Sequence, residues 1–440
     1  MSVELLTVLM FASVIVGILL GFPIAFVLGG LAAIFGYLLF GPGIANIFML
    51  RMFGVLQDNI LIAIPLFVYM GVVLEQTGIV GRLFDTMRLL LGRLPGGLAV
   101  TTIVSATIFA AGVGVVGASI VAIGLIALPS MLKYHYNKPL ATGAICAGGT
   151  LGILIPPSIL IVIYGPTAGL SVGQLFMAAI GPGLLLSLLY VIYTVVVCAI
   201  KPELGPAISR EEAAVPLRHK VSLFFTSVAP VAAIIVTVLG TIFFGLATPT
   251  EAAGVGAFAA LLLALAYRTL NLRTLWRTVH SALRITSMIY LVILGAQFFT
   301  SVFTRMGGGR VVRDAFVGLP FEPVVVLIMM LSVVFILGMF IDWLGVIMLA
   351  VPLFTPIAAA LGFEPIWFAM MVMLVLQTSF LTPPFAYAIF YLKGIAPPEV
   401  STIDIYKGIL PFVALQLLAL VLLYWQPQIA LWLPQFMLHR

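Results

Sequence analysis

Charged residues are scarce in this chain. Only 8% of its 440 residues are Asp, Glu, Lys or Arg, and 63% are hydrophobic. Soluble domains carry about 25% charged residues, and the mean hydropathy of this chain is +1.29. No stretch is polar and long enough to form a separate soluble domain. The composition therefore predicts an all-α polytopic membrane protein.

Residues that build disulfides, metal centres and catalytic sites are also few. Cys146 and Cys198 lie in apolar segments and the four histidines are scattered, so neither a disulfide framework nor zinc-ligand spacing exists. Asp342 is the only acidic residue well inside an apolar run, whereas intramembrane aspartyl proteolysis needs two facing aspartates. No Walker motif occurs. We therefore expect no enzyme and no organic cofactor, with an intramembrane enzyme as a remote alternative.

The apolar runs predict ten full crossings and two hairpins. The crossings are at residues 3–20, 23–40, 60–76, 139–165, 176–200, 221–246, 251–267, 285–304, 366–392 and 408–426. Two further apolar stretches, 98–132 and 323–357, are too long for one crossing and are interrupted near their centres. Both are predicted to be re-entrant hairpins that return to the side from which they start.

Positive residues are concentrated on one predicted side. Fifteen of the 20 Lys and Arg residues lie in connectors 77–97, 133–138, 201–220, 268–284 and 393–407. By the positive-inside rule these connectors are cytoplasmic, which places both termini outside the cytoplasm. The net charge of +6 lies mostly in these connectors and gives no reason to expect a nucleic-acid partner. Connectors 79–95 and 268–284 are predicted to form amphipathic helices at the membrane surface rather than solvated loops.

One motif occurs twice. Residues 149–158 read GTLGILIPPS and residues 377–384 read QTSFLTPP, each inside a run long enough to cross a bilayer. A spanning helix cannot keep its hydrogen-bond ladder through a Pro-Pro pair. In lipid, the freed backbone must be buried in protein or line a cavity. Two matching breaks point to the binding site of a secondary transporter.

The paired breaks divide the chain into an inverted repeat and its scaffold. Five crossings, an odd number, separate the starts of the two copies, so the copies are inverted. This is the architecture of alternating-access carriers. The predicted parts are N-terminal scaffold helices in 1–59, a first repeat in 60–200 with hairpin 98–132 and broken helix 139–165, central scaffold and surface helices in 201–284, a second repeat in 285–426 with hairpin 323–357 and broken helix 366–392, and a C-terminal tail in 427–440.

Three separated segments resemble a known family. Residues 247–253 (ATPTEAA), the 149–158 motif and the stretch 117–131 are similar to the large membrane (permease) subunit of tripartite ATP-independent periplasmic (TRAP) transporters. The resemblance runs over essentially the whole chain. In the first segment, Thr248, Pro249 and Glu251 are also explained by helix capping. In many members the first hairpin tip carries several serines, whereas here it carries Val113, Val115 and Val116.

The resemblance implies a function and its partners. Members are sodium-driven elevator carriers of the bacterial inner membrane, which would place both termini of this chain in the periplasm. They work with a small four-helix membrane subunit and a soluble periplasmic substrate-binding protein, and their typical substrates are small organic acids. A self-sufficient sodium- or proton-coupled organic-anion carrier without a binding protein remains an alternative. A passive channel is disfavoured, because hairpin tips at the midplane would close its path.

Broken helices supply ligands for ions at the membrane midplane. The half that ends there exposes carbonyl oxygens, and the half that starts there exposes N–H groups. Sodium, a hard cation, prefers oxygen ligands. We predict two sodium sites related by pseudo-symmetry. The first comprises Gly114, Gly117, Ser119, Gly149, Thr150 and Pro156, and the second comprises Gly338, Phe340, Thr378, Ser379 and Thr382, next to Asp342. The alternative is that these glycines and prolines only break helices and allow close packing.

Four residues are predicted to contact the substrate. Asp342 is an intramembrane acid, which marks a functional site by default, although it also suits the N-cap of a helix starting at about Trp343. Arg305 follows a crossing and precedes three glycines, so its guanidinium can pair with a carboxylate or extend to the membrane interface. The resemblance favours a basic substrate residue at that place. Ser158 and Ser119 lie at the starts of returning half-helices, where an anion is stabilised.

Overall fold

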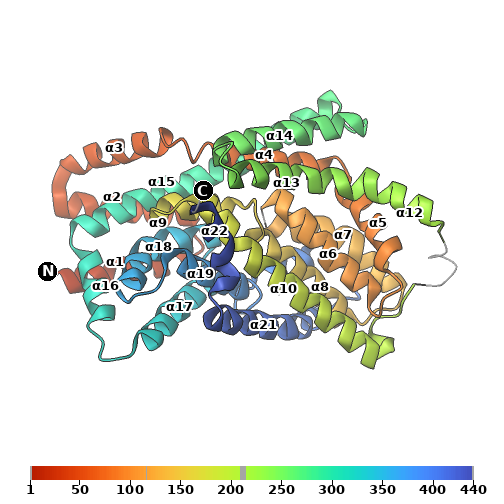
Figure 1. Cartoon of the computed structure of the whole chain (residues 1–440). Helices are drawn as coiled ribbons and strands as arrows, with labels where there is room; N and C mark the ends of the chain where they lie inside the picture. The colour runs from red at the N-terminus through yellow and green to blue at the C-terminus, as the bar shows by residue number, and fades with distance from the viewer. Residues whose placement is uncertain (1, 115, 209–214, 439–440) are drawn as a thin grey trace.

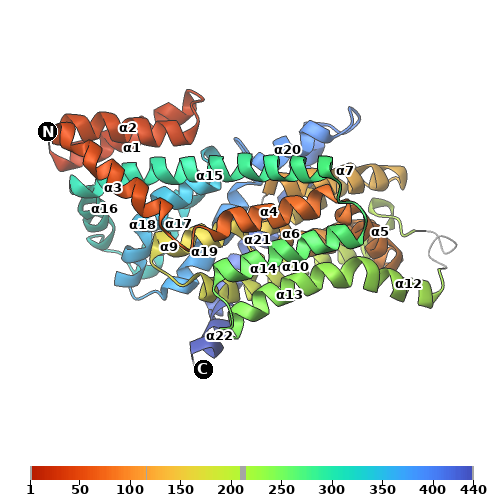
Figure 2. The same ribbon diagram turned by 90° about the horizontal axis from the view of Figure 1, so that it is seen from above.

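The computed structural model describes residues 2–114, 116–208 and 215–438, which form helices and turns without a strand (Figure 1). Within these residues, nine helices are long and apolar enough to cross a membrane, or ten if the bent pair α4–α5 is one span. The axes of most long helices are roughly aligned with one another, as the second view also shows (Figure 2). The chain is therefore an all-helical polytopic membrane protein.

The N-terminal and central helices agree with the predicted crossings with two differences. They comprise α1 (Val3–Leu19), α2 (Ile24–Phe40), η1 (Gly41–Gly43), α3 (Ile44–Leu56), η3 (Pro202–Leu204), α12 (Leu217–Leu223), the π-helical turn η4 (Phe224–Val228), α13 (Ala229–Phe243) and α14 (Pro249–Ala266). Helix α3 was not predicted, and one continuous segment, 217–243, replaces the crossing predicted at 221–246. A capping box between Thr248 and Glu251 begins α14, as the capping interpretation requires.

The first predicted repeat contains the expected interruptions. Its elements are α4 (Ala63–Gln76), α5 (Ile79–Leu91), α6 (Gly97–Val113), α7 (Val116–Lys133), α8 (Lys138–Thr150), η2 (Leu151–Ile153), α9 (Ile159–Ala168) and α10 (Val172–Ile200). Helix α5, predicted as an amphipathic helix, is present and meets α4 at 63°. Gly114, with φ +64°, lies between α6 and α7, which pack against each other.

The second predicted repeat has the same order of elements. It comprises α15 (Leu272–Arg305), α16 (Gly308–Val317), α17 (Pro323–Phe340), α18 (Trp343–Ala360), α19 (Pro365–Ser379), α20 (Tyr387–Ile395) and α21 (Thr402–Trp425), followed by α22 (Gln428–Leu438). The prediction of a separate surface helix at 268–284 is wrong, because residues from Leu272 onward form the first turns of the 34-residue helix α15. The predicted tail is largely the helix α22.

The two broken helices occupy the centre of the protein. Every residue of α8 from Leu140 to Thr150 is buried, and so is every residue of α19 from Ile366 to Ser379. In contrast, α2 and α13 expose large apolar side chains such as Phe26, Leu38 and Val236, as expected for surfaces that face lipid. The interrupted segments are therefore enclosed by protein.

The packing of the broken helices follows a reciprocal pattern. Helix α8 packs against its own hairpin, α6 and α7, and α19 packs against its own hairpin, α17 and α18. The half-helix after each break packs against the other hairpin, since α9 contacts α18 and α20 contacts α7. Each half of the chain thus completes the surroundings of the other.

Candidate functional site

The first break separates Thr150 from Ile159. The chain makes one turn of 3₁₀-helix and then continues through a turn and bends to Ser158, with a cis bond between Pro156 and Pro157. The Ser158 hydroxyl donates to the Ile153 carbonyl (2.7 Å), and the Thr150 hydroxyl donates to the Ala147 carbonyl (2.8 Å). Both side chains are fully buried, so their polar groups are part of the interior of the break.

The second break lies between Ser379 and Tyr387 and also contains a cis Pro-Pro bond. Its three hydroxyls donate to backbone carbonyls of preceding residues. Thr378 donates to Leu374 (2.8 Å), Ser379 to Leu376 (2.7 Å) and Thr382 to Thr378 (2.9 Å). A hydroxyl that has given its hydrogen keeps lone pairs on its oxygen. These oxygens can therefore coordinate a cation.

The two breaks meet directly. Nε2 of Gln377 donates to the Thr150 hydroxyl at 3.2 Å, which joins residues 227 positions apart. Oε1 of Gln377 and the Ser119 hydroxyl are buried and have no hydrogen-bond partner among the described residues. Buried polar atoms are normally paired, so these two oxygens are free acceptors beside the breaks.

The hairpin tips lie against the breaks. A Cβ on Gly114 would lie 3.2 Å from the backbone nitrogen of Ile159, and a Cβ on Gly338 would collide with the Ser379 hydroxyl. Gly149 touches Ile120, the residue after Ser119. Each tip therefore lies against a break, and in the second predicted sodium cluster two members, Gly338 and Ser379, are in direct contact. The side chain of Val113 and the whole of Val115 lie outside the described part of the structure.

A cavity of about 570 Å³ lies next to both tips. Its lining residues come from α2, α7, α15, α18 and the second break with α20. They are Pro23, Ile24, Ala25, Phe26, Val116, Gly117, Ile285, Ser287, Met288, Ile289, Leu291, Val292, Asp342, Trp343, Leu344, Phe380, Tyr387 and Tyr391. Of the predicted site residues, Gly117 and Asp342 line it. A Cβ on Gly117 would lie 2.7 Å from the ring of Tyr391, so the first tip is close to α20.

Asp342 occupies the N-cap position of α18, which begins at Trp343 as predicted. Its side chain is half-buried, and it contributes the only charged group in the lining of the large cavity among the described residues. The neighbouring Phe340 contributes its carbonyl, which accepts from the Tyr387 hydroxyl at 3.5 Å. The second tip thus combines a carboxylate and a carbonyl near a tyrosine.

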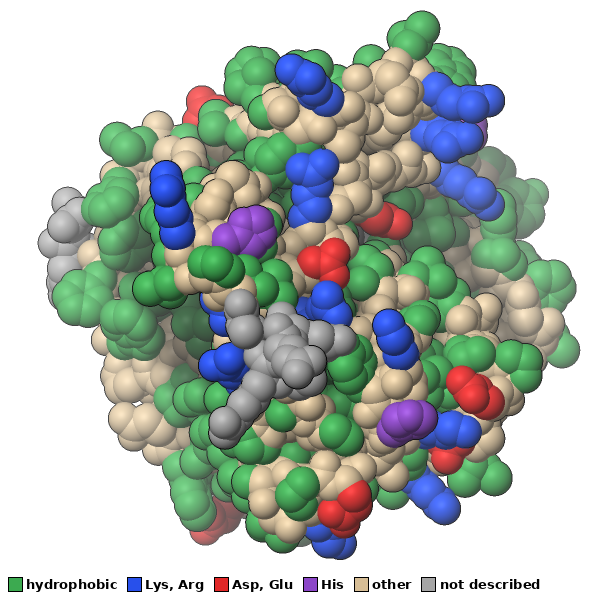
Figure 3. Space-filling view, turned by 90° about the vertical axis from the view of Figure 1, so that its right-hand side faces the viewer, with side chains coloured by type: hydrophobic (Ala, Val, Ile, Leu, Met, Phe, Trp, Pro, Cys, Tyr) green, Lys and Arg blue, Asp and Glu red, His purple; other side chains and the backbone are tan. Residues whose placement is uncertain are grey.

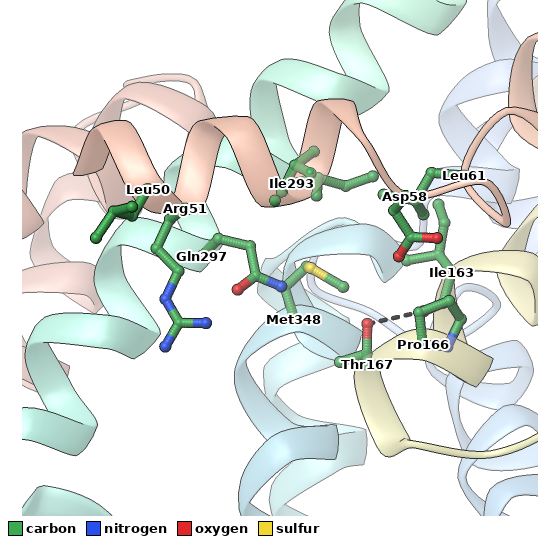
Figure 4. A pocket seen from close by; sticks show the side chains of 12 residues that line it. Leu50, Arg51, Asp58, Leu61, Ile163, Pro166, Thr167, Ile293, Gln297 and Met348 are labelled. Atoms are coloured by element: carbon green, nitrogen blue, oxygen red, sulfur yellow. Dashed lines mark hydrogen bonds between the residues drawn. The ribbon is translucent and has the colours of Figure 1, made fainter. Parts of the chain in front are cut away.

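A second cavity of about 190 Å³ lies farther along α15, beyond the turns that line the large cavity (Figure 4). Arg51 and Gln297 lie on one side and Asp58 on the other, with Thr167 of α9 donating to the Ile163 carbonyl at 2.7 Å. The larger cavity includes Val292 of α15, and this smaller one includes Ile293. One helix therefore lines both cavities.

Arg305 is not brought to either cavity. Its side chain is exposed at the end of α15, and its guanidinium lies 5.3 Å from the ring centre of Phe40. Ser158 lies inside the first break and does not line the large cavity. The contact roles of these residues and of Ser119 stay predictions.

Several residues of the breaks and of the cavity lining were missed in the sequence. Gln377 is an amide within an apolar run, and its polarity next to Thr378 is a signal that points to it. Trp343, Tyr387 and Tyr391 gave no such signal, since aromatic residues in apolar runs usually pack in the core. Ser287 lies within the predicted crossing 285–304, and nothing in the sequence marked it as a lining residue.

Comparison with known proteins shows the family. The family described as "Tripartite ATP-independent periplasmic transporter, DctM component" matches residues 11–429. The C4-dicarboxylate TRAP transporter large permease protein DctM of Pseudomonas aeruginosa is 30% identical over 93% of this chain and 94% of its own. The isethionate TRAP transporter permease protein DctMQ of Oleidesulfovibrio alaskensis is 31% identical over 84% of this chain, which spans 57% of that longer protein.

A solved structure shares the fold. The YdaH transporter of Alcanivorax borkumensis, whose structure is described as having an unusual topology, superimposes with a TM-score of 0.63 over 91% of this chain and 96% of its own, at 15% sequence identity. The family match covers nearly the whole chain and includes both breaks. The chain therefore belongs to the DctM family of large TRAP transporter permease components, and it is a multi-pass membrane transport protein rather than an enzyme.

Proposed function

We propose that this chain is the large transmembrane subunit of a sodium-coupled secondary transporter that imports a small organic acid delivered by a periplasmic binding protein. Alternating access is by an elevator movement. The single observation that carries the proposal is the contact of the two breaks, where Gln377 donates to Thr150 beside both hairpin tips. Paired discontinuous helices that meet in this way are typical of carrier binding sites.

Sodium is proposed to bind on each side of this contact. The first site uses Gly114, Gly117, Ser119, Gly149, Thr150 and Pro156, and the second uses Gly338, Phe340, Thr378, Ser379 and Thr382. Support comes from the unpaired hydroxyl of Ser119 and from the threonine and serine hydroxyls that already donate to carbonyls. The free Oε1 of Gln377 adds one acceptor between the two sites. Oxygens of this kind suit a hard cation.

The solute is proposed to bind in the large cavity with Asp342 at its edge. The fully buried hydroxyl groups of Ser119, beside the first tip, and Ser158, in the first break, are proposed to contact the solute from the interior of the protein. Arg305 lies further along α15, so we propose that it meets the carboxylate of the solute at the outer end of this helix. Replacing Arg305 by Ala is then expected to raise the KM for solute presented by the binding protein. The control is Arg313→Ala, which changes an exposed arginine of the next helix, α16.

The moving unit is proposed to comprise the two hairpins and the two broken helices. Their reciprocal packing, in which α9 contacts α18 and α20 contacts α7, supports a single body. The scaffold is proposed to consist largely of α1, α2, α10, α13 and α14. Helix α15 lines both cavities, which is the position expected of a helix along which such a body slides.

A small four-helix membrane subunit and a binding protein are the proposed partners. The DctMQ relative is much longer than this chain, which spans 57% of it, and the rest of that length has room for such a subunit. The proposed location is the bacterial inner membrane with both termini in the periplasm. In support, Lys and Arg side chains gather on the end of the molecule seen in Figure 3, opposite the N-terminus in Figure 1.

The test is uptake by proteoliposomes that contain this chain and its small subunit. Succinate, a C4-dicarboxylate of the class in the name of the Pseudomonas aeruginosa relative, and phenylacetate are offered with and without binding protein, under an inward sodium gradient or with sodium replaced by choline. Uptake is expected to require both sodium and the binding protein. Uptake by this chain alone would instead establish the self-sufficient carrier, and uptake that is unchanged in choline would refute sodium coupling.

A further inference from the structure

The large cavity has little charge for a site proposed to take organic acids. Among the described residues that line it, Asp342 is the only charged side chain, and none is Lys, Arg or His. The other polar side chains are the hydroxyls of Ser287, Tyr387 and Tyr391. Apart from Trp343, whose indole N–H can donate, all remaining lining residues are apolar or glycine.

We propose that this cavity selects a monocarboxylate with a bulky apolar body, such as an aromatic ring or a branched chain, and rejects dicarboxylates. This inference rests on the proposed transport function and narrows the substrate class. The volume of about 570 Å³ accommodates a ring-bearing acid, since small-molecule pockets measure roughly 300–1,000 Å³.

The polar groups of the cavity suffice for one carboxylate. A carboxylate that leaves water needs hydrogen-bond donors or a paired charge in its place. The hydroxyls of Ser287 and Tyr391 can donate to a single carboxylate, and that of Tyr387 can join them by giving up its 3.5 Å hydrogen bond to the Phe340 carbonyl. A second carboxylate would lack a basic partner and would share a poorly solvated space with Asp342. Like charges repel strongly in such a space, so the acid acts against dianions.

The apolar part of the lining suits a ring. Five aromatic side chains lie around the cavity: Phe26 of α2, and Trp343, Phe380, Tyr387 and Tyr391 of the second half. The ring centroids of Phe380 and Tyr387 are 6.1 Å apart in an edge-to-face arrangement. Aromatic rings bind other rings by stacked or edge-to-face contacts in addition to burial of area. Val116 at the first tip adds an aliphatic contact.

Binding of three acids to the purified permease complex tests the inference. Phenylacetate, 4-methylpentanoate and succinate are titrated by calorimetry at one fixed sodium concentration. We expect both monoacids to bind at least about tenfold more tightly than succinate, a ratio that apolar pockets commonly achieve. Succinate binding as tight as either monoacid, or no binding of the monoacids at millimolar concentration, would overturn it.

Two variants separate the proposed causes. Asp342→Asn is expected to tighten succinate binding at least about fivefold relative to phenylacetate, because the repelling charge is removed. Trp343→Leu is expected to weaken phenylacetate binding more than 4-methylpentanoate binding, whereas Trp432→Leu, an exposed residue of α22 outside the cavity, is the matched control. Unchanged relative affinities in both site variants would refute the assignment. Sodium-driven uptake that prefers succinate would preserve the proposed function and end only the narrower substrate class.

Discussion

The two halves that carry hairpins and broken helices follow one plan but contribute differently to the large cavity. Among the described residues, the first half supplies only Val116 and Gly117 to its lining. The second half supplies the carboxylate, Asp342, and all four aromatic side chains of the tip and break. Buried hydroxyl groups, in contrast, occur in both breaks, as Thr150 and Thr378 illustrate.

This difference indicates a division of labour within a duplicated architecture. Oxygens suited to a cation occur in both halves, whereas the groups that we propose to recognise the solute are concentrated, among the described residues, in the second. If this is correct, ion coupling depends on both breaks and solute recognition depends on the second half. Mutations can therefore separate the two properties.

The largest effect is expected from Asp342→Asn. It removes the carboxylate next to the proposed second sodium site, and we therefore expect sodium-coupled uptake of phenylacetate to fall at least about tenfold, which corresponds to about 1.4 kcal/mol. The measurement is initial uptake in proteoliposomes with equal amounts of inserted protein. Asp314→Asn changes an exposed acid of α16 and is expected to leave uptake unchanged. Full activity of the Asp342 variant would remove the distinction between the halves.

The next effect tests whether both halves bind sodium. Thr150→Val and Thr378→Val each remove a hydroxyl oxygen but keep the shape of the side chain. Loss of one polar ligand contact is worth about 1 kcal/mol, so the sodium concentration for half-maximal uptake is expected to rise about fivefold in each variant. The control is Thr194→Val, a buried threonine of α10 that also donates to a backbone carbonyl. A shift in only one variant would assign sodium to one half.

The breaks could be predicted from the sequence because a Pro-Pro pair acts locally on the helix ladder. The tip at Gly114 and the start of α18 at Trp343 were also predictable, because a glycine with positive φ and an N-cap aspartate act just as locally. The continuity of α15 was not, because Arg273, Arg277 and Arg284 made its first turns look like a separate polar segment, although they continue one helix. How far Arg305 lies from the two hairpin tips could not be predicted either. Which polar group lies near the cavity depends on tertiary packing, which no local pattern encodes.

A smaller effect is expected from filling the contact between the second tip and its break. In Gly338→Ala the new methyl group would collide with the Ser379 hydroxyl, and overpacking of this kind costs about 1–3 kcal/mol. We expect a lower thermal midpoint and reduced uptake. Gly240→Ala has no atom within 4 Å of the added Cβ and is the control. Gly149→Ala in the first half, which would meet Ile120, is expected to behave like Gly338→Ala, and a neutral result there would make the second tip the more constrained one.

The smallest effect on stability is expected at the contact between the halves. Gln377→Leu removes one neutral hydrogen bond to Thr150, but it also removes a buried Oε1 that has no partner among the described residues. These contributions have opposite signs and similar size, about 1 kcal/mol each, so the thermal midpoint in choline chloride is expected to change little.

The same variant separates a structural amide from a ligand. A ligand that binds the folded state stabilises it by mass action, so sodium chloride is expected to raise the thermal midpoint of the wild-type protein. If Oε1 of Gln377 contacts an ion between the breaks, this increase will be smaller in Gln377→Leu. The control is Gln416→Leu, another fully buried amide, which lies in α21 outside the breaks. An undiminished sodium response in Gln377→Leu would make the contact a structural joint, and the two halves would then bind their ions independently.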